Sequence, residues 1–306
     1  MSAIQSAASR LPYSVHPSTD FIPALDGFRA LSIALVVVSH LGMESWVPGI
    51  FGVNIFFFVS GLLITRQILS ELGRSNTIAL GKFYVRRLLR LYPALLTAVL
   101  LGGILYLLFG GRLHLGDVLA AVLYWSNYWE LNGGYISTLP SAIHPYSIFW
   151  SLAVEEHYYL FFPLIALLFG RRRLKFAVLL LLGIVLVTAW REYLALNCQF
   201  RNSGCMGGYW FRDWRILHAT DTRIDSILYG ALLTVLLGSS VSDRLLRVLR
   251  SSWTFLFGLG LIVGSLLIRD PMFRQTFRFT IQGIGLFFCV GSTLFAPQFE
   301  LSLIHI

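Results

Sequence analysis

An arginine and a histidine lie eleven residues apart in one strongly apolar run. Arg29 and His40 belong to the stretch "DGFRALSIALVVVSH" (26–40), which begins with Asp26. In an α-helix this spacing gives a rise of about 16 Å and roughly three turns plus 20° of rotation, so both side chains share one face at different depths. A neutral imidazole can accept a proton. His40 is therefore a candidate general base, the alternative being that it only hydrogen-bonds a neighbouring helix.

A second candidate site is formed by two arginines in "FYVRRLLRLYP". Arg87 and Arg90 are one helical turn apart, directly before Pro93. Their forked guanidinium groups suit phosphate oxygens. The alternative is that these charges only set the orientation of the chain in a membrane.

Carboxylates lie in the apolar segment "FWSLAVEEHYYLFFP", where Glu155 has Tyr159 one turn away. A carboxylate in such a segment must be paired or protonated. Glu155 therefore pairs with an arginine or holds the tautomer of His40, as a carboxylate does in nucleophile–base systems.

Two further segments carry polar or small residues within apolar runs. In "GVNIFFFVSGLLIT", Ser60 and Gly61 permit close approach of a ligand, although close helix packing is the stronger interpretation. In "HATDTRIDSILYGALL", Arg223 and Asp225 either bind a polar acceptor or take part in an ordinary structural ion pair between helices. Asp26 likewise lies on the acceptor side or in a structural ion pair.

Composition predicts an integral membrane protein. Hydrophobic residues make up 56% of the chain, charged residues make up 13%, and the mean hydropathy is +0.71, whereas soluble domains contain roughly 25% charged residues. The net charge of +9 is accounted for by inward-facing basic loops beside anionic lipid, so we expect membrane lipids and no nucleic acid as partners.

The apolar runs predict an all-α bundle of about eight to nine transmembrane helices. Three basic segments should face the cytoplasm: 81–90, 171–175 and 242–250. An even number of crossings between them makes the ambiguous stretch 111–131 a re-entrant or interfacial segment and places the amino terminus inside. The predicted spans are 28–47, 49–69, 92–110, 148–169, 176–190, 220–238, 253–268 and 279–296.

The sequence predicts a cytoplasmic segment at 1–24 without a cleavable signal, followed by one transmembrane domain at 25–306. Cys198 and Cys205 fall in one predicted outer loop, where a disulfide and two free thiols are both open. No Cys/His spacing resembles a zinc site, so no metal is expected.

Taken in order, these segments resemble the acyltransferase 3 type of multi-spanning acyltransferases, which includes O-antigen, exopolysaccharide and nodulation-factor acetylases. The likeness covers residues 25 to about 238. It implies an arginine followed by an essential histidine, matched by Arg29 and His40, and a glutamate, matched by Glu155. The Arg-x-x-Arg pair of the family is matched by Arg87 and Arg90.

Two departures from the family pattern stand out. Asn54 replaces the aspartate of a frequent Gly-Val-Asp, so no role of that aspartate can be carried over. The family usually continues with further spans, and we expect this chain to be truncated at its carboxyl end.

The resemblance implies transfer of an acyl group, expected to be acetyl, from acyl-CoA to a hydroxyl of a carbohydrate or other cell-envelope acceptor, such as a lipid-linked glycan. Acyl-CoA would be a co-substrate, with no permanently bound cofactor, and the enzyme would be a multi-pass protein of the inner (plasma) membrane. Arg29, Arg87 and Arg90, with Ser60 and Gly61, would form the acyl-CoA site; His40 would act as base or covalent acyl relay, and Glu155 would orient it.

Two other functions remain open from sequence. A transporter could use intramembrane Arg, His and Glu residues as a proton or substrate pathway. A catalytically inactive protein would bind acyl-CoA without turnover. The oligomeric state is likewise open.

Overall fold

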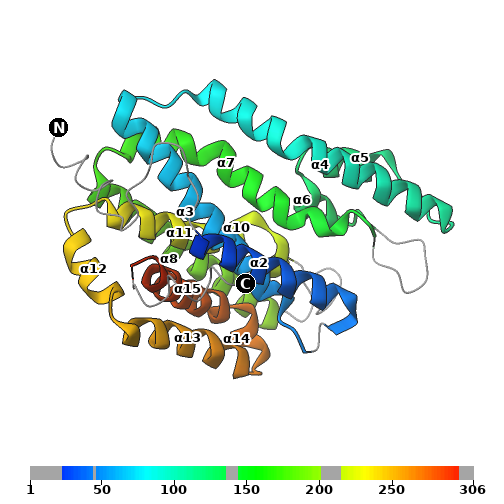
Figure 1. Cartoon of the computed structure of the whole chain (residues 1–306). Helices are drawn as coiled ribbons and strands as arrows, with labels where there is room; N and C mark the ends of the chain where they lie inside the picture. Colours follow the sequence, from blue (N-terminus) through cyan, green and yellow to red (C-terminus); the bar gives the residue numbers. More distant parts are fainter. Residues whose placement is uncertain (1–22, 44–45, 136–143, 201–214, 296–306) are drawn as a thin grey trace.

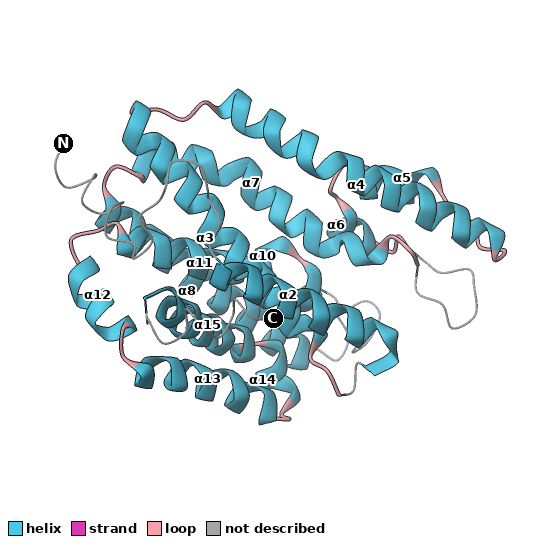
Figure 2. Cartoon of the chain, viewed as in Figure 1, coloured by secondary structure: helices cyan, strands magenta, loops and turns pink. Residues whose placement is uncertain are grey.

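The computed structural model describes residues 23–43, 46–135, 144–200 and 215–295, without the side chains of 198–200, and every regular element in these ranges is a helix (Figures 1 and 2). The helices are, in chain order, α2 Pro23–Val38, the π-helical turn η1 Ser39–Met43, α3 Gly49–Ser75, α4 Leu80–Leu108, α5 Leu115–Val122, α6 Ser126–Leu131, the 3₁₀ turn η2 Ser147–Phe149, α7 Trp150–Phe169, α8 Arg173–Phe200, α10 Thr220–Arg223, α11 Asp225–Leu237, α12 Ser242–Leu249, α13 Ser252–Leu267, α14 Pro271–Gln275 and α15 Phe277–Phe295.

Six of these helical segments are long and apolar enough to cross a membrane, which supports the predicted class of protein. A seventh is added if α11 and α12, which meet at 115°, count as one broken span. The candidates are Ala24–Met43, Gly49–Ser75, Leu80–Leu108, Ser147–Phe169, Arg173–Asn197 and Phe277–Phe295. Helices also form at the two other predicted spans, but α11 has only 13 residues and α13 only 16. The count of eight to nine crossings therefore stays a prediction.

The ambiguous stretch 111–131 folds as two short helices, α5 and α6, of eight and six residues. A helix of eight residues is only about 12 Å long, far less than the roughly 30 Å core of a bilayer. Figure 1 shows both helices at one end of the pair formed by α4 and α7. Their position at headgroup depth remains a prediction.

The long helix α3 lies at the centre of the bundle, because small residues let its neighbours approach closely. A Cβ atom at Gly61 would collide with the backbone carbonyl of Ile227 on α11. A Cβ atom at Gly230 of α11 would collide in turn with the carbonyl of Phe58. On another side of α3, the hydroxyl of Ser32 on α2 donates to the Gly52 carbonyl at 2.9 Å.

The lobe that contains α5 and α6 is organised around the buried carboxylate of Asp117. It accepts hydrogen bonds from the indole N–H of Trp129 at 2.9 Å and from the backbone N–H of His114 at 3.0 Å. Nε2 of the buried His144 lies 3.5 Å from Oδ2 of Asp117. Although burial opposes the charged form, these interactions together hold the pKa of Asp117 below its usual range.

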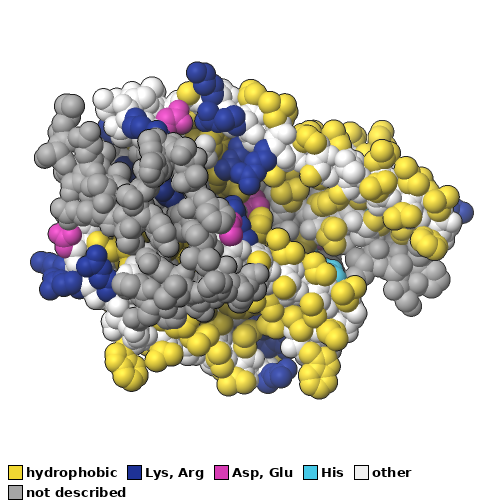
Figure 3. Space-filling model, in the orientation of Figure 1, with side chains coloured by type: hydrophobic (Ala, Val, Ile, Leu, Met, Phe, Trp, Pro, Cys, Tyr) yellow, Lys and Arg dark blue, Asp and Glu magenta, His cyan; other side chains and the backbone are white. Residues whose placement is uncertain are grey.

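The basic segments meet at one end of the bundle, as predicted. Arg86 at the start of α4 lies 3.8 Å from Glu71 near the end of α3. In the turn between α7 and α8, Arg171 donates to the carbonyl of Asn76, and Arg173 lies beside Gly238 at the end of α11. In Figure 3 hydrophobic side chains cover much of the visible face over α4 and α13, while many Lys and Arg side chains lie toward the upper and left parts. That this end is cytoplasmic remains a prediction.

Candidate active site

Side chains from three helices meet around Tyr159 of α7. Its hydroxyl donates to Glu155 Oε1 at 3.3 Å. The guanidinium of Arg87 on α4 lies over its ring, 4.7 Å from the centroid. The Ser60 side chain of α3 lies beside both Tyr159 and Glu155. Arg87 is also within electrostatic range of Glu155 and Glu156, so the structure brings together Arg87, Glu155 and Ser60 of the predicted site.

Arg90 lies one turn beyond Arg87 on the same helix, and the two charges repel each other. Arg90 is exposed. Arg86, by contrast, has Glu71 as a partner. Within the part of the chain that the structure describes, no carboxylate forms an ion pair with Arg90. A guanidinium pair in this setting suits an external anion such as phosphate.

Arg29 forms an ion pair within its own helix. Its Nη1 lies 3.1 Å from Asp26 Oδ1, and both side chains are partly exposed. Of the two interpretations of Asp26, the structural ion pair is the one that has a contact in the structure. Such exposed pairs contribute little stability, roughly 0 to 1 kcal/mol, so Arg29 can exchange its partner for a ligand at small cost.

His40 lies in the turn η1 that directly follows α2, and its ring is exposed on the surface of the chain. Nδ1 lies 2.8 Å from the carbonyl oxygen of Val36. Because a carbonyl only accepts, Nδ1 must carry the proton, and in the neutral ring Nε2 is then the acceptor. Two residues later the helix breaks, since Gly42 has φ +91°. The geometry thus presents a basic nitrogen next to a break in the helix.

The predicted contact between Glu155 and His40 is absent from the described residues. Glu155 bonds Tyr159, and His40 bonds the Val36 carbonyl of its own helix. The other expectation for Glu155, a pairing with an arginine, fits better because Arg87 acts on its carboxylate electrostatically.

Gly61 lies at the contact between α3 and α11, where the Ile227 carbonyl fills the space that a side chain would need. This position favours the packing interpretation over an acyl-CoA contact. Ser60, its neighbour, faces the cluster around Tyr159 instead.

Of the two interpretations of the segment with Arg223 and Asp225, the interhelical ion pair has a contact in the structure at Asp225, but not at Arg223. Asp225 pairs with Arg191 of α8, whose Nη2 lies 2.9 Å from its Oδ2, and both side chains are fully buried. Arg223 donates instead to the amide oxygen of Asn54 on α3, and Asn54 donates in turn to Gln282 Oε1 of α15 at 2.6 Å.

A histidine–carboxylate pair near Arg223 was not predicted. His218 Nδ1 lies 3.1 Å from Glu130 Oε2, and its ring stacks on Trp150 at 4.3 Å. Burial raises the pKa of Glu130 to about 8, and burial together with the charge of Arg223 lowers the pKa of His218 to about 3. Both groups are therefore mainly neutral at pH 7. The available signal was a glutamate in the aromatic segment "YWSNYWEL".

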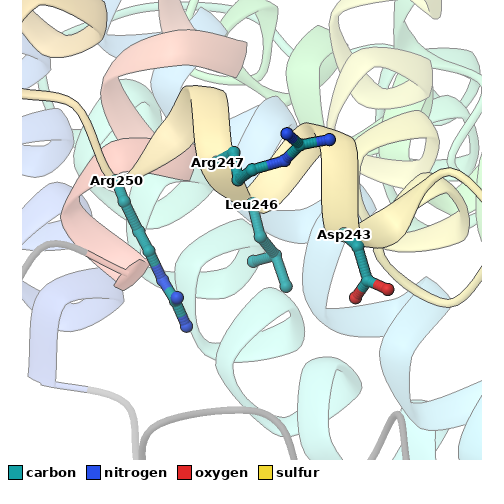
Figure 4. Close-up of a pocket in the computed structure, with 4 residues that line it drawn as sticks. All are labelled: Asp243, Leu246, Arg247 and Arg250. Atoms are coloured by element: carbon teal, nitrogen blue, oxygen red, sulfur yellow. The ribbon is translucent and has the colours of Figure 1, made fainter.

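Arg191 was also missed, although an arginine at the end of an apolar run is itself a signal. A pocket of about 460 Å³ lies elsewhere, on α12 at the basic end, where Asp243, Leu246, Arg247 and Arg250 line it (Figure 4). None of these four residues was predicted as part of the site. Cys198 and Cys205 lie outside the residues whose side chains are described, so the possible disulfide remains open.

Comparison with known proteins decides the family. A model described as an acyltransferase domain, of the acyltransferase 3 type, matches residues 22–303. The chain belongs to the acyltransferase 3 family. The segments that carried the resemblance lie on α2, α3, α4, α7 and α10–α11, and four of these elements contact α3 or the cluster around Tyr159.

Curated relatives within the family are O-acetyltransferases by name. The chain is 32% identical to O-acetyltransferase OatA of Staphylococcus aureus strain NCTC 8325 over 219 residues, which cover 71% of this chain and 35% of the relative. It is 31% identical over 222 residues to a putative O-acetyltransferase of strain COL, with the same coverage. The alignments thus span about a third of the relatives' length. No solved structure matches the chain significantly.

Proposed function

We propose that this chain is a membrane O-acyltransferase that moves an acetyl group from acetyl-CoA to a hydroxyl of a carbohydrate or other cell-envelope acceptor. Family membership and the names of the O-acetyltransferase relatives support the reaction class. The observation that carries the proposal is the guanidinium of Arg87, fixed over Tyr159 beside Glu155 and followed one turn later by Arg90.

The donor site lies toward the basic end of the bundle. Arg87 and Arg90 hold phosphate oxygens of acyl-CoA, since forked guanidiniums bind phosphate with two parallel hydrogen bonds. Arg29 adds a third charge once it releases Asp26. Glu155 balances the charge of Arg87, and the ring of Tyr159 keeps the guanidinium in place. In this proposal the basic end and the amino terminus face the cytoplasm, where acyl-CoA is made, and the membrane is the plasma membrane.

His40 performs the acid–base step at the other end of α2. The acceptor hydroxyl attacks the carbonyl carbon of the thioester while its proton passes to Nε2 of His40, and the C–S bond breaks to release the CoA thiolate, which takes up a proton. General base catalysis of this kind contributes roughly 10²- to 10⁴-fold in rate. In a relay variant, Nε2 itself receives the acetyl group and passes it to the acceptor.

An assay with purified protein and acetyl-CoA labelled in the acetyl group tests the proposal. Wild type should transfer label to a glycan acceptor, and His40→Ala should lose roughly 10²- to 10⁴-fold of this activity while it still binds acetyl-CoA. Arg74→Gln is the control, because Arg74 is exposed and its hydrogen bonds within the described ranges go to Ser70 of its own helix. Equal transfer by His40→Ala would refute the mechanism.

The same assay separates the remaining alternatives. Label that stays on the protein after a brief reaction, and is lost in His40→Ala, indicates the relay variant. Solute movement across liposomes without acetyl-CoA binding would favour a transporter. Binding of acetyl-CoA without turnover by wild type would indicate an inactive protein.

A further inference from the structure

Three arginines surround one buried aromatic ring in the bundle. Phe279 on α15 is fully buried. The guanidinium carbon of Arg223 lies 4.0 Å from its ring centroid, that of Arg191 5.2 Å and that of Arg278 5.8 Å. Arg223 also lies 5.7 Å from the ring of Trp150. We call Arg191, Arg223 and Arg278 the arginine cluster.

Positive charge exceeds negative charge in this cluster. The charged neighbours that act on Arg223 are Asp225, Arg191 and Arg278, so three guanidinium groups face one carboxylate. Asp225 is engaged with Arg191. Among the described residues, Arg223 has only the neutral amide of Asn54 as a hydrogen-bond acceptor. Buried charges are normally paired, because an uncompensated one loses its hydration without replacement.

Hydrogen-bond donors of the cluster are also left without acceptors. Nε and Nη1 of Arg223 are buried and have no partner within the described parts of the chain, and the same holds for Nε of Arg191. Both side chains are fully buried. Other groups of Arg191 are satisfied, by the Thr222 carbonyl at 2.7 Å and the Thr280 hydroxyl at 2.9 Å. The unmet donors therefore concentrate on Arg223.

Stacking on aromatic rings uses the faces of the guanidinium groups and leaves their N–H edges available. We propose that the arginine cluster is a binding site for an anion with carboxylate or phosphate oxygens, which Nε and Nη1 of Arg223 hold by charge-assisted hydrogen bonds. Arg278 is only partly buried and forms the rim through which the anion enters.

Two sources can supply this chemistry: a free anion, or an acidic group carried by a sugar. The second source would make the cluster a specificity site for an acidic acceptor and rests on the proposed acetyl transfer. The first is independent of it. Binding itself is measured without acetyl-CoA, so failure of the anion site and failure of the proposed reaction are separate results.

The experiment follows the thermal unfolding of purified full chain in detergent micelles, in a chloride-free buffer, while one probe is titrated. Acetate and inorganic phosphate are the free-anion probes, and glucuronate is compared with glucose as an acid-bearing and a neutral sugar. We expect Tm to rise with the anions and not with glucose. A larger rise with glucuronate than with acetate assigns the site to an acidic sugar; equal rises assign it to a free anion.

Variants locate the effect. Arg223→Lys and Arg278→Gln should weaken anion binding by roughly tenfold or more, because each loses charge-assisted hydrogen bonds or charge. Arg274→Gln is the matched control: it removes an exposed arginine four residues before Arg278 that is not part of the cluster. Arg278→Gln keeps the test decisive if Arg223→Lys does not fold.

Asn54→Asp supplies the missing carboxylate from within the protein. It should raise Tm in the absence of any probe and abolish the further rise with acetate or phosphate, since Arg223 is then paired. No rise of wild-type Tm with any anion, or an equal rise in all cluster variants, would overturn the proposal.

Discussion

The guanidinium of Arg87 on α4 lies over the ring of Tyr159 on α7, and the hydroxyl of that ring bonds Glu155. Tyr159 thus connects two groups. One is the cation Arg87, which we assign to the acyl-CoA site, and the other is the buried carboxylate of Glu155. The ring and the hydroxyl of Tyr159 have separable roles.

Substitutions distinguish these roles. Arg87→Lys should raise KM for acetyl-CoA about tenfold with a smaller change in kcat, because lysine keeps the charge but loses the fork and the flat stacking surface. Tyr159→Phe keeps the stacking ring, so KM should stay within about twofold. Initial rates at varied acetyl-CoA measure both. A KM unchanged in Arg87→Lys would remove Arg87 from the donor site.

Helix packing at α3 and α11 predicts a stability effect. Gly61→Ala and Gly230→Ala each place a methyl group against a backbone carbonyl, which cannot move as a flexible side chain does. We expect a loss of about 1–3 kcal/mol from such overpacking. Gly81→Ala is the control, because the space around that helical glycine is open and alanine favours a helix. Thermal unfolding in micelles should give lower Tm values for Gly61→Ala and Gly230→Ala than for Gly81→Ala. Equal Tm values for all three variants would contradict the close contact.

The carboxylate of Asp117 organises the lobe of α5 and α6. Asp117→Asn replaces one acceptor oxygen of this buried side chain by a donor, so the part-buried N–H of His114 or Trp129 loses its partner, at a loss of about 1–3 kcal/mol. Asp270→Asn serves as control. Asp270 is the exposed N-cap of α14 and accepts from the backbone N–H of Phe273, and asparagine caps a helix equally well. Hydrogen exchange should show faster opening near residues 115–131 in Asp117→Asn alone.

The pair of Glu130 and His218 predicts a pH dependence of stability. Burial raises the pKa of Glu130 to about 8, so folding favours the protonated carboxyl. The contribution of Glu130 to the stability of the fold is fully present below about pH 4.5 and is lost as pH rises toward 8. His218, with a pKa lowered to about 3, acts in the opposite sense: its contribution is present above about pH 6.5 and is lost in acid.

Between pH 6.5 and 8 the two effects separate, because His218 is already neutral in both the folded and the unfolded chain. Wild-type Tm should fall across this window, and Glu130→Gln should flatten the fall, since glutamine does not titrate. Parallel curves for wild type and variant would show that Glu130 ionises normally in the folded protein.

Sequence reasoning worked where one helix carries the information. Apolar runs located a helix at each predicted span, and Arg87 lies one turn from Arg90 as expected. It failed where helices meet. The sequence allowed an interhelical ion pair at Asp225 but did not identify its partner Arg191, 34 residues earlier, nor the contact of Arg223 with Asn54, 169 residues away. Such partners depend on the order and rotation of packed helices, which periodicity along one segment does not contain.

The lobe of α5 and α6 shows a related limit. Its sequence was apolar enough to suggest a crossing, and only the count of basic loops argued against one. The structure resolves it through Asp117, whose buried bonds to Trp129 and His114 tie two short helices together. A carboxylate that collects donors from separate segments cannot be recognised before its donors are known to be neighbours.

The break at Gly42 ends the helical stretch that begins with α2, so the helical distance between Arg29 and His40 is fixed. Since Arg29 lies near one end and His40 near the other, a single inserted residue between them would move the imidazole by about 1.5 Å along the axis and turn it by about 100°. The same insertion beyond Gly42 would fall outside the helix and leave that register intact. An insertion between Arg29 and His40 should therefore not be tolerated, whereas one a few positions later, beyond Gly42, should be tolerated almost completely.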